Sequence, residues 1–271
     1  MIWRRFIFRT IYFFKKHILL LLYRAKGIKV LTRKQFIRSI PSLKSLEIGP
    51  FASPCITGPQ VDYFDVLDQD SLRKRANHLQ LSEESCPFIK YVSSSGDLSI
   101  VKETYQIIFS SHCIEHQPDL ILHLKSVEQL LDEKGFYYLV VPDKRYCMDA
   151  FLPESGIGEV LQAHEQKRKL HTLRSVIEHH ALTTHNEAWR HWMGFHGSRY
   201  ADVHQIRNAI EEFNRNPSAY IDVHGWQFTP ASFAGIISIL RQMKYISLSV
   251  EKIYPTRPGS FEFYAVLKKS R

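Results

Sequence analysis

From residue 42 onward, short apolar runs alternate with longer segments of helical periodicity. The short runs are rich in β-branched and aromatic residues, as buried strands are. They cover residues 43–48, 61–64, 88–92, 105–110 and 136–141. The clearest helix between them covers residues 119–131, with Leu120, Leu124, Val127 and Leu131 on one face. Strands that alternate with helices predict an α/β fold with a mostly parallel sheet.

The alternation stops after residue 141 and resumes at residue 230. Residues 230–244 then predict a helix, and residues 246–253 and 261–267 predict two strands joined by a turn at Pro258 and Gly259. Strands joined this closely pair antiparallel. We therefore predict a Rossmann-like, doubly wound sheet of seven strands that is mostly parallel, with a helical insertion after strand five at about residues 147–225 and an antiparallel C-terminal hairpin.

The N-terminal segment predicts an amphipathic helix over residues 2–24. One arc of this helix is basic and carries Arg4, Arg5, Arg9, Lys15 and Lys16. The opposite arc is apolar and carries Trp3, Phe6, Ile7, Phe13, Phe14, Ile18 and Leu21. The longest uncharged run, residues 17–23, is too short to cross a bilayer. We assign residues 1–40 to a basic arm and residues 41–271 to a single domain.

The net charge of +9 belongs to this arm. Residues 1–46 hold twelve of the 36 basic side chains and none of the 27 acidic ones. Basic residues opposite aromatic ones favour binding to an anionic membrane surface through residues 1–24. The same stripe would serve a helix docked on the protein's own core or on the second subunit of a homodimer, and both alternatives stay open. Nucleic acid is not an expected partner, because no recognition motif follows.

The four cysteines stand far apart, with no Cys-x-x-Cys spacing. Neither a structural zinc site nor a secreted disulfide framework is indicated. The sequence therefore predicts a cytoplasmic protein, with the arm at the inner face of the membrane.

Candidate cofactor residues follow the predicted strands, since open α/β sheets bind ligands at the carboxyl ends of their strands. Gly49 follows the first strand and lets the backbone approach a ligand closely. Asp65 ends the second strand, where a carboxylate can accept both hydroxyls of a ribose. Asp97, in the loop after the third strand, could accept from an adenine amino group. A turn glycine and solvated surface acids are the alternative interpretations, and the full Gly-x-Gly-x-x-Gly fingerprint of nicotinamide dehydrogenases is absent.

These segments resemble the class I S-adenosylmethionine-dependent methyltransferases over residues 42–271. Residues 46–50, Leu-Glu-Ile-Gly-Pro, are similar to their cofactor loop, Asp65 to their ribose-binding acid, and residues 107–116 to their fourth strand and loop. The resemblance implies S-adenosylmethionine as the cofactor. It also implies a set of cofactor-binding residues: Glu47, Gly49, Pro50, Phe51, Ser53, Asp65, Asp97 and Ser111. The loop departs from the family in carrying Phe51 and Ala52 where many members have further glycines.

Two longer strings, residues 141–146 and 222–230, resemble a bacterial subgroup of methyltransferases often associated with surface-glycan assembly. Methyl transfer requires an aligned acceptor and a base that removes its proton. We expect His112 to be that base, or else to shape only the cofactor pocket, and we expect Asp143 and His224 to act beside it. His116 belongs, by resemblance, to the turn into the next helix. The expected acceptor contacts are Lys144, Arg145, Tyr146 and His164.

Nine of the fourteen histidines lie between His164 and His224. No His-Glu-x-x-His pair occurs, so no metal site is predicted. The weaker alternative is a divalent ion held by His164, His180, Asp222 and His224, which include suitable donors.

The sequence therefore predicts a methyltransferase that O-methylates a sugar or glycolipid precursor at the cytoplasmic membrane face. One alternative acceptor is a small aromatic or lipid-quinone hydroxyl. The alternative from another class is a non-catalytic, membrane-tethered partner of glycan-assembly enzymes.

Overall fold

The structure is a computed structural model that describes residues 2–215 and 217–270, with side chains from residue 10 onward in the first helix. Its seven strands form one sheet in the order β3-β2-β1-β4-β5-β7-β6. Their bounds are β1 Ser45–Ile48, β2 Val61–Asp65, β3 Tyr91–Val92, β4 Tyr105–Ser111, β5 Leu131–Pro142, β6 Leu248–Tyr254 and β7 Glu262–Lys269. Strand β7 runs antiparallel to both β5 and β6, and the other pairs are parallel. The predicted doubly wound sheet with its reversed hairpin is confirmed.

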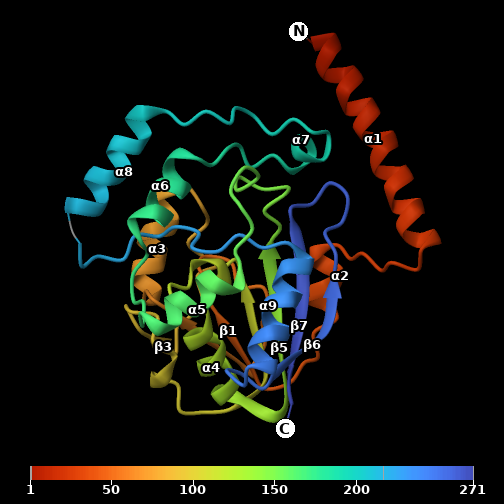
Figure 1. Ribbon diagram of the computed structural model, residues 1–271. Coiled ribbons are helices and arrows are strands. Elements are labelled where there is room, and N and C mark those ends of the chain that lie inside the picture. The colour runs from red at the N-terminus through yellow and green to blue at the C-terminus, as the bar shows by residue number, and fades with distance from the viewer. Residues whose placement is uncertain (1, 216, 271) are drawn as a thin grey trace.

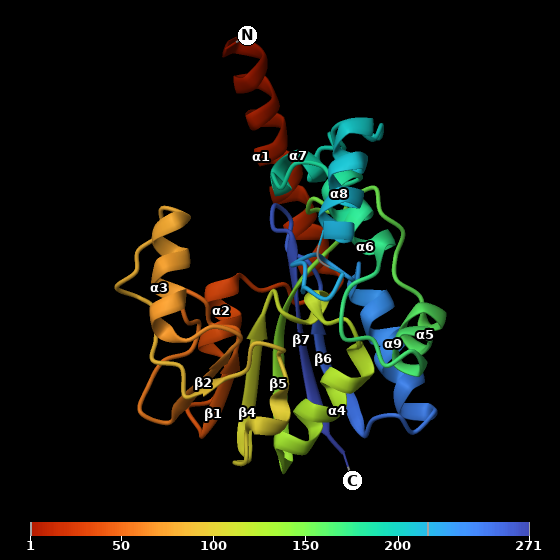
Figure 2. The ribbon, with the colours of Figure 1, turned by 90° about the vertical axis from the view of Figure 1, so that its left-hand side faces the viewer.

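Helices cover both faces of the sheet (Figures 1 and 2). α4 (Leu120–Leu130), α5 (Ile157–Glu165) and α9 (Pro230–Gln242) lie on one side, and α2 (Arg33–Arg38) and α3 (Gln69–His78) lie on the other. The larger core lies under α4 and α9, where Leu124, Phe233 and Ile237 are buried against the strands. The predicted helices begin where expected, because the side chains of Asp119 and Thr229 cap α4 and α9.

Two strand lengths differ from the prediction. β5 begins at Leu131, where the predicted helix was still running, and pairs with Tyr105 of β4. β3 is only two residues long, and Phe88, at the start of the predicted strand, is 73% exposed. The apolar run at residues 88–92 therefore marks the edge of the sheet and not a buried strand.

The helical insertion lies above the carboxyl ends of the strands (Figures 1 and 2). After α5 it continues through α6 (Leu173–Ala181), α7 (Ala188–Trp192) and α8 (Val203–Arg215). Helices α6 and α8 pack through a small core of their own that includes Val176, Ala209 and Val223. Two 3-10 turns, η1 (Leu98–Ile100) and η2 (Ile114–His116), follow β3 and β4. The insertion thus covers the edge of the sheet at which the sequence predicts the cofactor site.

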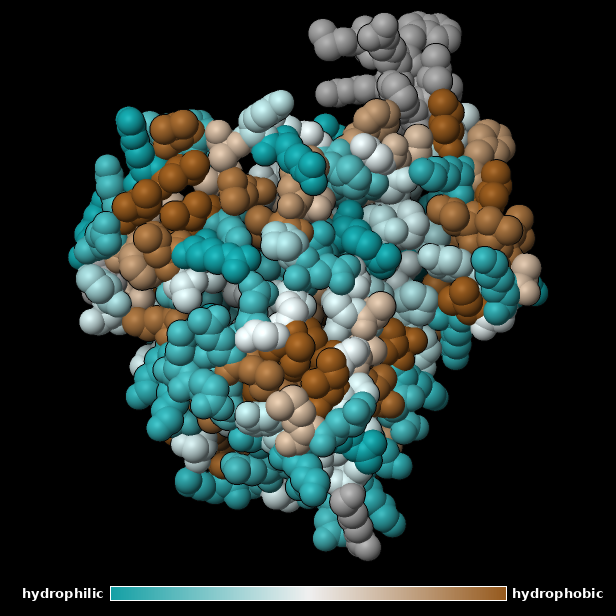
Figure 3. All heavy atoms as spheres, viewed as in Figure 1, coloured by the Kyte–Doolittle hydropathy of each residue, from teal (hydrophilic) through white to brown (hydrophobic). Residues whose placement is uncertain are grey.

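The first helix, α1 (Ile2–Ala25), stands beside the body of the molecule (Figure 1). Its inward face contacts α7, where the Lys15 ammonium donates to the Trp192 carbonyl at 2.7 Å. The outward face is an apolar stripe of exposed side chains: Ile11, Phe13, Phe14, Ile18, Leu21 and Leu22. Apolar surface gathers there in Figure 3. The interpretation in which this stripe docks on the protein's own core is therefore wrong for the described side chains. The residues of the predicted basic and apolar arcs that lie at positions 3–9 are outside the described side chains.

No helix of the described chain is both long and apolar enough to cross a bilayer. The second helix behaves differently from the first, because Phe36 of α2 is completely buried and its ring stacks on that of Tyr264, with centroids 4.6 Å apart. The core therefore begins before residue 41, inside the segment that the sequence assigns to the arm.

Candidate active site

The loop after β1 carries two residues in the left-handed region of backbone space. Gly49 has φ +71° and an exposed position, and Phe51 has φ +48°. The Asp65 carboxylate, at the end of β2, accepts from the Phe51 amide at 3.4 Å and from the Leu67 amide at 3.1 Å. Burial raises the pKa of Asp65. The structure thus brings Gly49, Phe51 and Asp65 together at the strand ends.

Other predicted cofactor residues serve the loops themselves. The Glu47 carboxylate accepts from the amides of Cys55 at 2.9 Å and Ile56 at 3.0 Å, which holds the returning end of the loop. Burial raises the pKa of Glu47 to about 7. Asp97 is exposed and caps η1 by accepting from the Ser99 amide at 2.9 Å. Pro50 is buried within the loop, and Ser53 is exposed on it.

His112, at the end of β4, lies between two buried carboxylates. Its Nε2 is 2.8 Å from Glu262 and its Nδ1 is 3.5 Å from Glu115. Burial lowers the pKa of His112, but the interactions of the ring with the Glu115 and Glu262 carboxylates outweigh burial and raise the pKa to about 9. At neutral pH His112 is therefore a cation that can donate a proton. It has no free nitrogen lone pair to accept one, so its geometry does not fit the expected role of the base.

Arg33 of α2 joins this group from a distant part of the chain. Its guanidinium forms an ion pair with Glu262 and donates to the Ser111 hydroxyl at 2.8 Å and to the Cys55 sulfur at 3.2 Å. Ser111, predicted to bind cofactor, is thus engaged by a residue of the predicted arm. Sequence reasoning missed Arg33 and Glu262, because neither stands in a motif.

A second cluster lies beside His112 and consists of Glu115, His116 and His224. One donor atom from each lies within 4.8 Å of the others. The Glu115 side chain is completely buried, and neither of its oxygens has a hydrogen-bond partner in the described part of the chain. Nδ1 of His116 is 2.9 Å from Asp222, and Nδ1 of His224 is 2.7 Å from Asp149. The structure therefore places two imidazoles beside this carboxylate, and each imidazole has an acid close to its Nδ1.

The residues after β5 form a more distant group. The Asp143 carboxylate is completely buried and accepts from Arg145 Nε at 2.9 Å, from its terminal nitrogen at 2.6 Å and from the Thr256 hydroxyl. Its oxygens are thus occupied within the protein. Lys144 donates to the Ala150 carbonyl at 3.3 Å. Arg145, whose side chain is 47% exposed, lies over the ring of Tyr146 and forms an ion pair with Asp143.

Tyr146 in turn stacks on Trp192 of the insertion, with ring centroids 3.9 Å apart and planes 4° from parallel. The Trp192 indole N–H donates to the Ser260 carbonyl at 2.7 Å. This stack joins the end of β5 to α7 and to the turn before β7.

Two histidines of the predicted metal alternative lie elsewhere. His164, on α5, pairs with Asp119 at 2.9 Å, and His180, on α6, lies 3.3 Å from Glu212. His224 and Asp222 do meet at the cluster, together with Glu115 and His116. The spacing that could have found two of these residues is His112-x-x-Glu115-His116, a metal-ligand spacing in some zinc peptidases, although here it lies on a turn and not on a helix.

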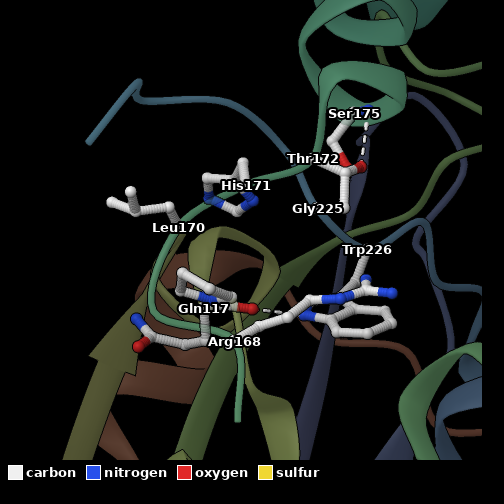
Figure 4. Close-up of a pocket in the computed structure, with 9 residues that line it drawn as sticks. Gln117, Arg168, Leu170, His171, Thr172, Ser175, Gly225 and Trp226 are labelled. Carbon is white, nitrogen blue, oxygen red and sulfur yellow. Dashed lines mark hydrogen bonds between the residues drawn. The ribbon is translucent and has the colours of Figure 1, made fainter. Parts of the chain in front are cut away.

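A small pocket flanks the cluster and is lined by the residues that hold the Glu115–His116 turn (Figure 4). The Trp226 indole N–H donates to the Gln117 carbonyl at 2.5 Å, and His171 Nε2 donates to the His116 carbonyl at 3.0 Å. Burial lowers the pKa of His171 to about 4, so this ring is neutral. The Gly225 amide donates to the Glu115 carbonyl at 2.8 Å. Three neighbouring carbonyls are thus satisfied, which fixes the turn that presents the cluster.

Solved structures of methyltransferases are similar to this chain at low identity. The CcbJ methyltransferase from Streptomyces caelestis matches over 88% of this chain and 94% of its own, at 10% identity and a TM-score of 0.43. The mitomycin 7-O-methyltransferase MmcR matches over 88% of this chain and 53% of its own, at 8% identity and a TM-score of 0.42. Magnesium protoporphyrin IX methyltransferase (ChlM) from Synechocystis PCC 6803, with bound SAH, matches over 94% and 82%, at 11% identity and a TM-score of 0.38.

No family model matches the sequence, and no curated protein matches it. Similarity this distant assigns neither a substrate nor site residues to the chain. The substrate and the site residues must be argued from the geometry of the chain's own residues.

Proposed function

We propose that this chain is an S-adenosylmethionine-dependent methyltransferase. The observation that carries the proposal is the juxtaposition, at the carboxyl ends of β1 and β2, of Gly49 in the left-handed region and the buried Asp65 carboxylate. An exposed glycine backbone beside a carboxylate fits an adenosyl group, because the first allows close approach and the second accepts from ribose hydroxyls. When bound, the cofactor supplies a methyl group on a sulfonium centre.

The proposed acceptor is an oxygen of a sugar or glycolipid precursor, as the resemblance of residues 141–146 and 222–230 implies. The half-exposed Arg145 guanidinium, at the end of β5, supports an anionic ligand such as a phosphorylated sugar. His112 and the Glu115 cluster lie at the end of β4, where charge on a reacting oxygen would be balanced.

The proposal includes a place at an anionic membrane surface. The apolar stripe of α1 supports it, since Phe14, Ile18 and Leu21 are 61%, 56% and 65% exposed on a segment without acidic residues. Aromatic and aliphatic groups enter the acyl boundary while the basic residues meet the headgroups.

The test of the activity is calorimetric titration of the full chain with S-adenosylhomocysteine (SAH), with a nicotinamide dinucleotide as the control ligand. The expected result is stoichiometric, micromolar binding of SAH alone. Binding of the dinucleotide instead would replace the proposal with a dehydrogenase, and binding of neither would favour the non-catalytic partner.

A further inference from the structure

Glu115 occupies a position that hydrogen bonding within the chain does not explain. Its carboxylate is completely buried, and among the described residues neither oxygen has a hydrogen-bond partner. An ionised carboxylate in such a place costs several kcal/mol unless another group compensates it. The nearest positive group, His112 Nδ1, is 3.5 Å away and also serves Glu262 through its other nitrogen. The carboxylate is therefore available to a further ligand.

The two imidazoles beside Glu115 have the orientation of metal ligands. Asp222 faces Nδ1 of His116 and Asp149 faces Nδ1 of His224, at 2.9 and 2.7 Å. Among the described residues only the contact between His224 and Asp149 is a hydrogen bond. This bond sets the tautomer of His224 and leaves its other ring nitrogen as the donor, which is the second-shell pattern of metal-binding histidines. Nε2 of His116 indeed lies on the side of Glu115, 3.9 Å from its Oε1.

We propose that Glu115, His116 and His224 bind a divalent transition-metal ion. Two imidazoles and one carboxylate suit ions such as Zn²⁺ or Mn²⁺, whereas Mg²⁺ and Ca²⁺ prefer oxygen ligands. The donor atoms lie within 4.8 Å of one another, and an ion about 2.1 Å from each needs them at most about 4.2 Å apart, so small side-chain rotations close the triangle.

Three protein ligands leave coordination positions open, as in catalytic metal sites. The two histidine side chains are 23% and 11% exposed while Glu115 is buried, so the open side lies with the imidazoles. There the ion would bind the acceptor hydroxyl and lower its pKa. This role of the ion, but not its binding, rests on the proposed methyltransferase function.

The experiment is titration of the chelator-treated full chain with Zn²⁺ alone, followed by competition with excess Mg²⁺. We expect one Zn²⁺ per chain that Mg²⁺ does not displace. Asp149→Asn and Asp222→Asn should weaken Zn²⁺ binding by about 10- to 100-fold, and Glu115→Gln and His224→Gln by more. Because the buried Glu115 variant could fail to fold, the two aspartate variants keep the test decisive.

The matched control is His196→Gln. His196 Nδ1 lies 2.9 Å from Nδ1 of His191, so it belongs to a histidine pair outside the proposed site. Its substitution should leave the Zn²⁺ affinity unchanged. The proposal is overturned if no stoichiometric Zn²⁺ binds, or if His196→Gln abolishes binding while the Asp149 and Asp222 variants retain it. SAH titration of the same samples separates this outcome from a failure of the methyltransferase proposal.

Discussion

At the residue scale, Asp65 has two roles at the same strand end. It joins the loops after β1 and β2 by accepting from the amides of Phe51 and Leu67, at 3.4 and 3.1 Å. The longer of these bonds is weak, and an ionised carboxylate has further acceptor capacity for ribose hydroxyls. Because the structural bonds of Asp65 are few and one is weak, its substitution should reduce ligand affinity more than the stability of the fold.

Replacement of Asp65 with Ala should weaken SAH binding roughly 10- to 100-fold, because hydrogen bonds to a charged group contribute about 1.5–3 kcal/mol. Calorimetry measures the dissociation constant, and thermal unfolding shows that the variant is folded. Asp70→Ala is the matched control, since this α3 side chain is 82% exposed. An unchanged dissociation constant in a folded Asp65 variant would remove the ribose assignment.

Glu47 gives a pH dependence of stability. Its pKa is raised by burial to about 7, against 4.5 for an ordinary glutamate. The folded state therefore holds this proton at pH values where the unfolded chain has released it, and stability falls as pH rises between those two pKa values. Above about pH 7 the contribution is constant.

The measurement compares urea unfolding of the wild type and Glu47→Gln at pH 5 and pH 8. The variant has no proton to release, so wild-type stability relative to it should fall by on the order of 2–3 kcal/mol from pH 5 to pH 8. Glu103→Gln is the control, because its partners lower the pKa of Glu103 to about 2 and keep it ionised throughout. A difference that does not change with pH would contradict the raised pKa of Glu47.

At the element scale, α1 has its polar contacts turned inward and its apolar side chains turned outward. Lys15 donates to α7, and the ring of Tyr12 lies 6.1 Å from that of Trp189. Burial of an exposed aliphatic or aromatic side chain contributes about 1.5–3 kcal/mol. The outward stripe therefore needs a partner, and the basic composition of the arm favours an anionic lipid surface.

The double variant Phe14→Ser/Ile18→Ser should lose at least tenfold in affinity for vesicles of phosphatidylcholine with phosphatidylserine, since it removes two buried anchors. Co-sedimentation with these vesicles, and with pure phosphatidylcholine, is the measurement. Phe88→Ser is the control, because Phe88 is exposed outside α1. Equal vesicle binding, or a wild-type dimer that the double variant loses, would assign the stripe to another partner.

The strands could be predicted from the sequence because a buried strand requires a continuous run of apolar residues. Residues 136–141, for example, are apolar throughout, and Gly135 and Pro142 mark the ends of this run. Gly49 and Asp65 could be placed for the same reason, since each follows a strand. Glu262 could not, because it reaches His112 from 150 residues further along the chain. The role of Glu115 depends on His224 and Asp149, which only the folded insertion brings near.

At the scale of the whole molecule, charged contacts connect the N-terminal segment to the site. Arg33 of α2 binds Glu262 of β7, Glu262 binds His112 of β4, and His112 faces Glu115. α1 and the insertion meet through α7 above the same edge of the sheet. A membrane that received α1 would therefore lie beside the insertion, and the proposed acceptor side would then lie near lipid.

The position at which the N-terminal arm ends and the core begins can be tested by truncation. Leu31 and Phe36 are 8% and 0% exposed, whereas the outward face of α1 is exposed. Removal of residues 1–28 should leave the stability of the body nearly unchanged, while removal of residues 1–40 deletes Phe36 and the partner of Glu262. Loss of a buried phenylalanine side chain alone costs about 3–5 kcal/mol. Urea unfolding followed by circular dichroism should therefore separate the two truncations by at least that amount, and equal stabilities would show that the core begins after residue 40.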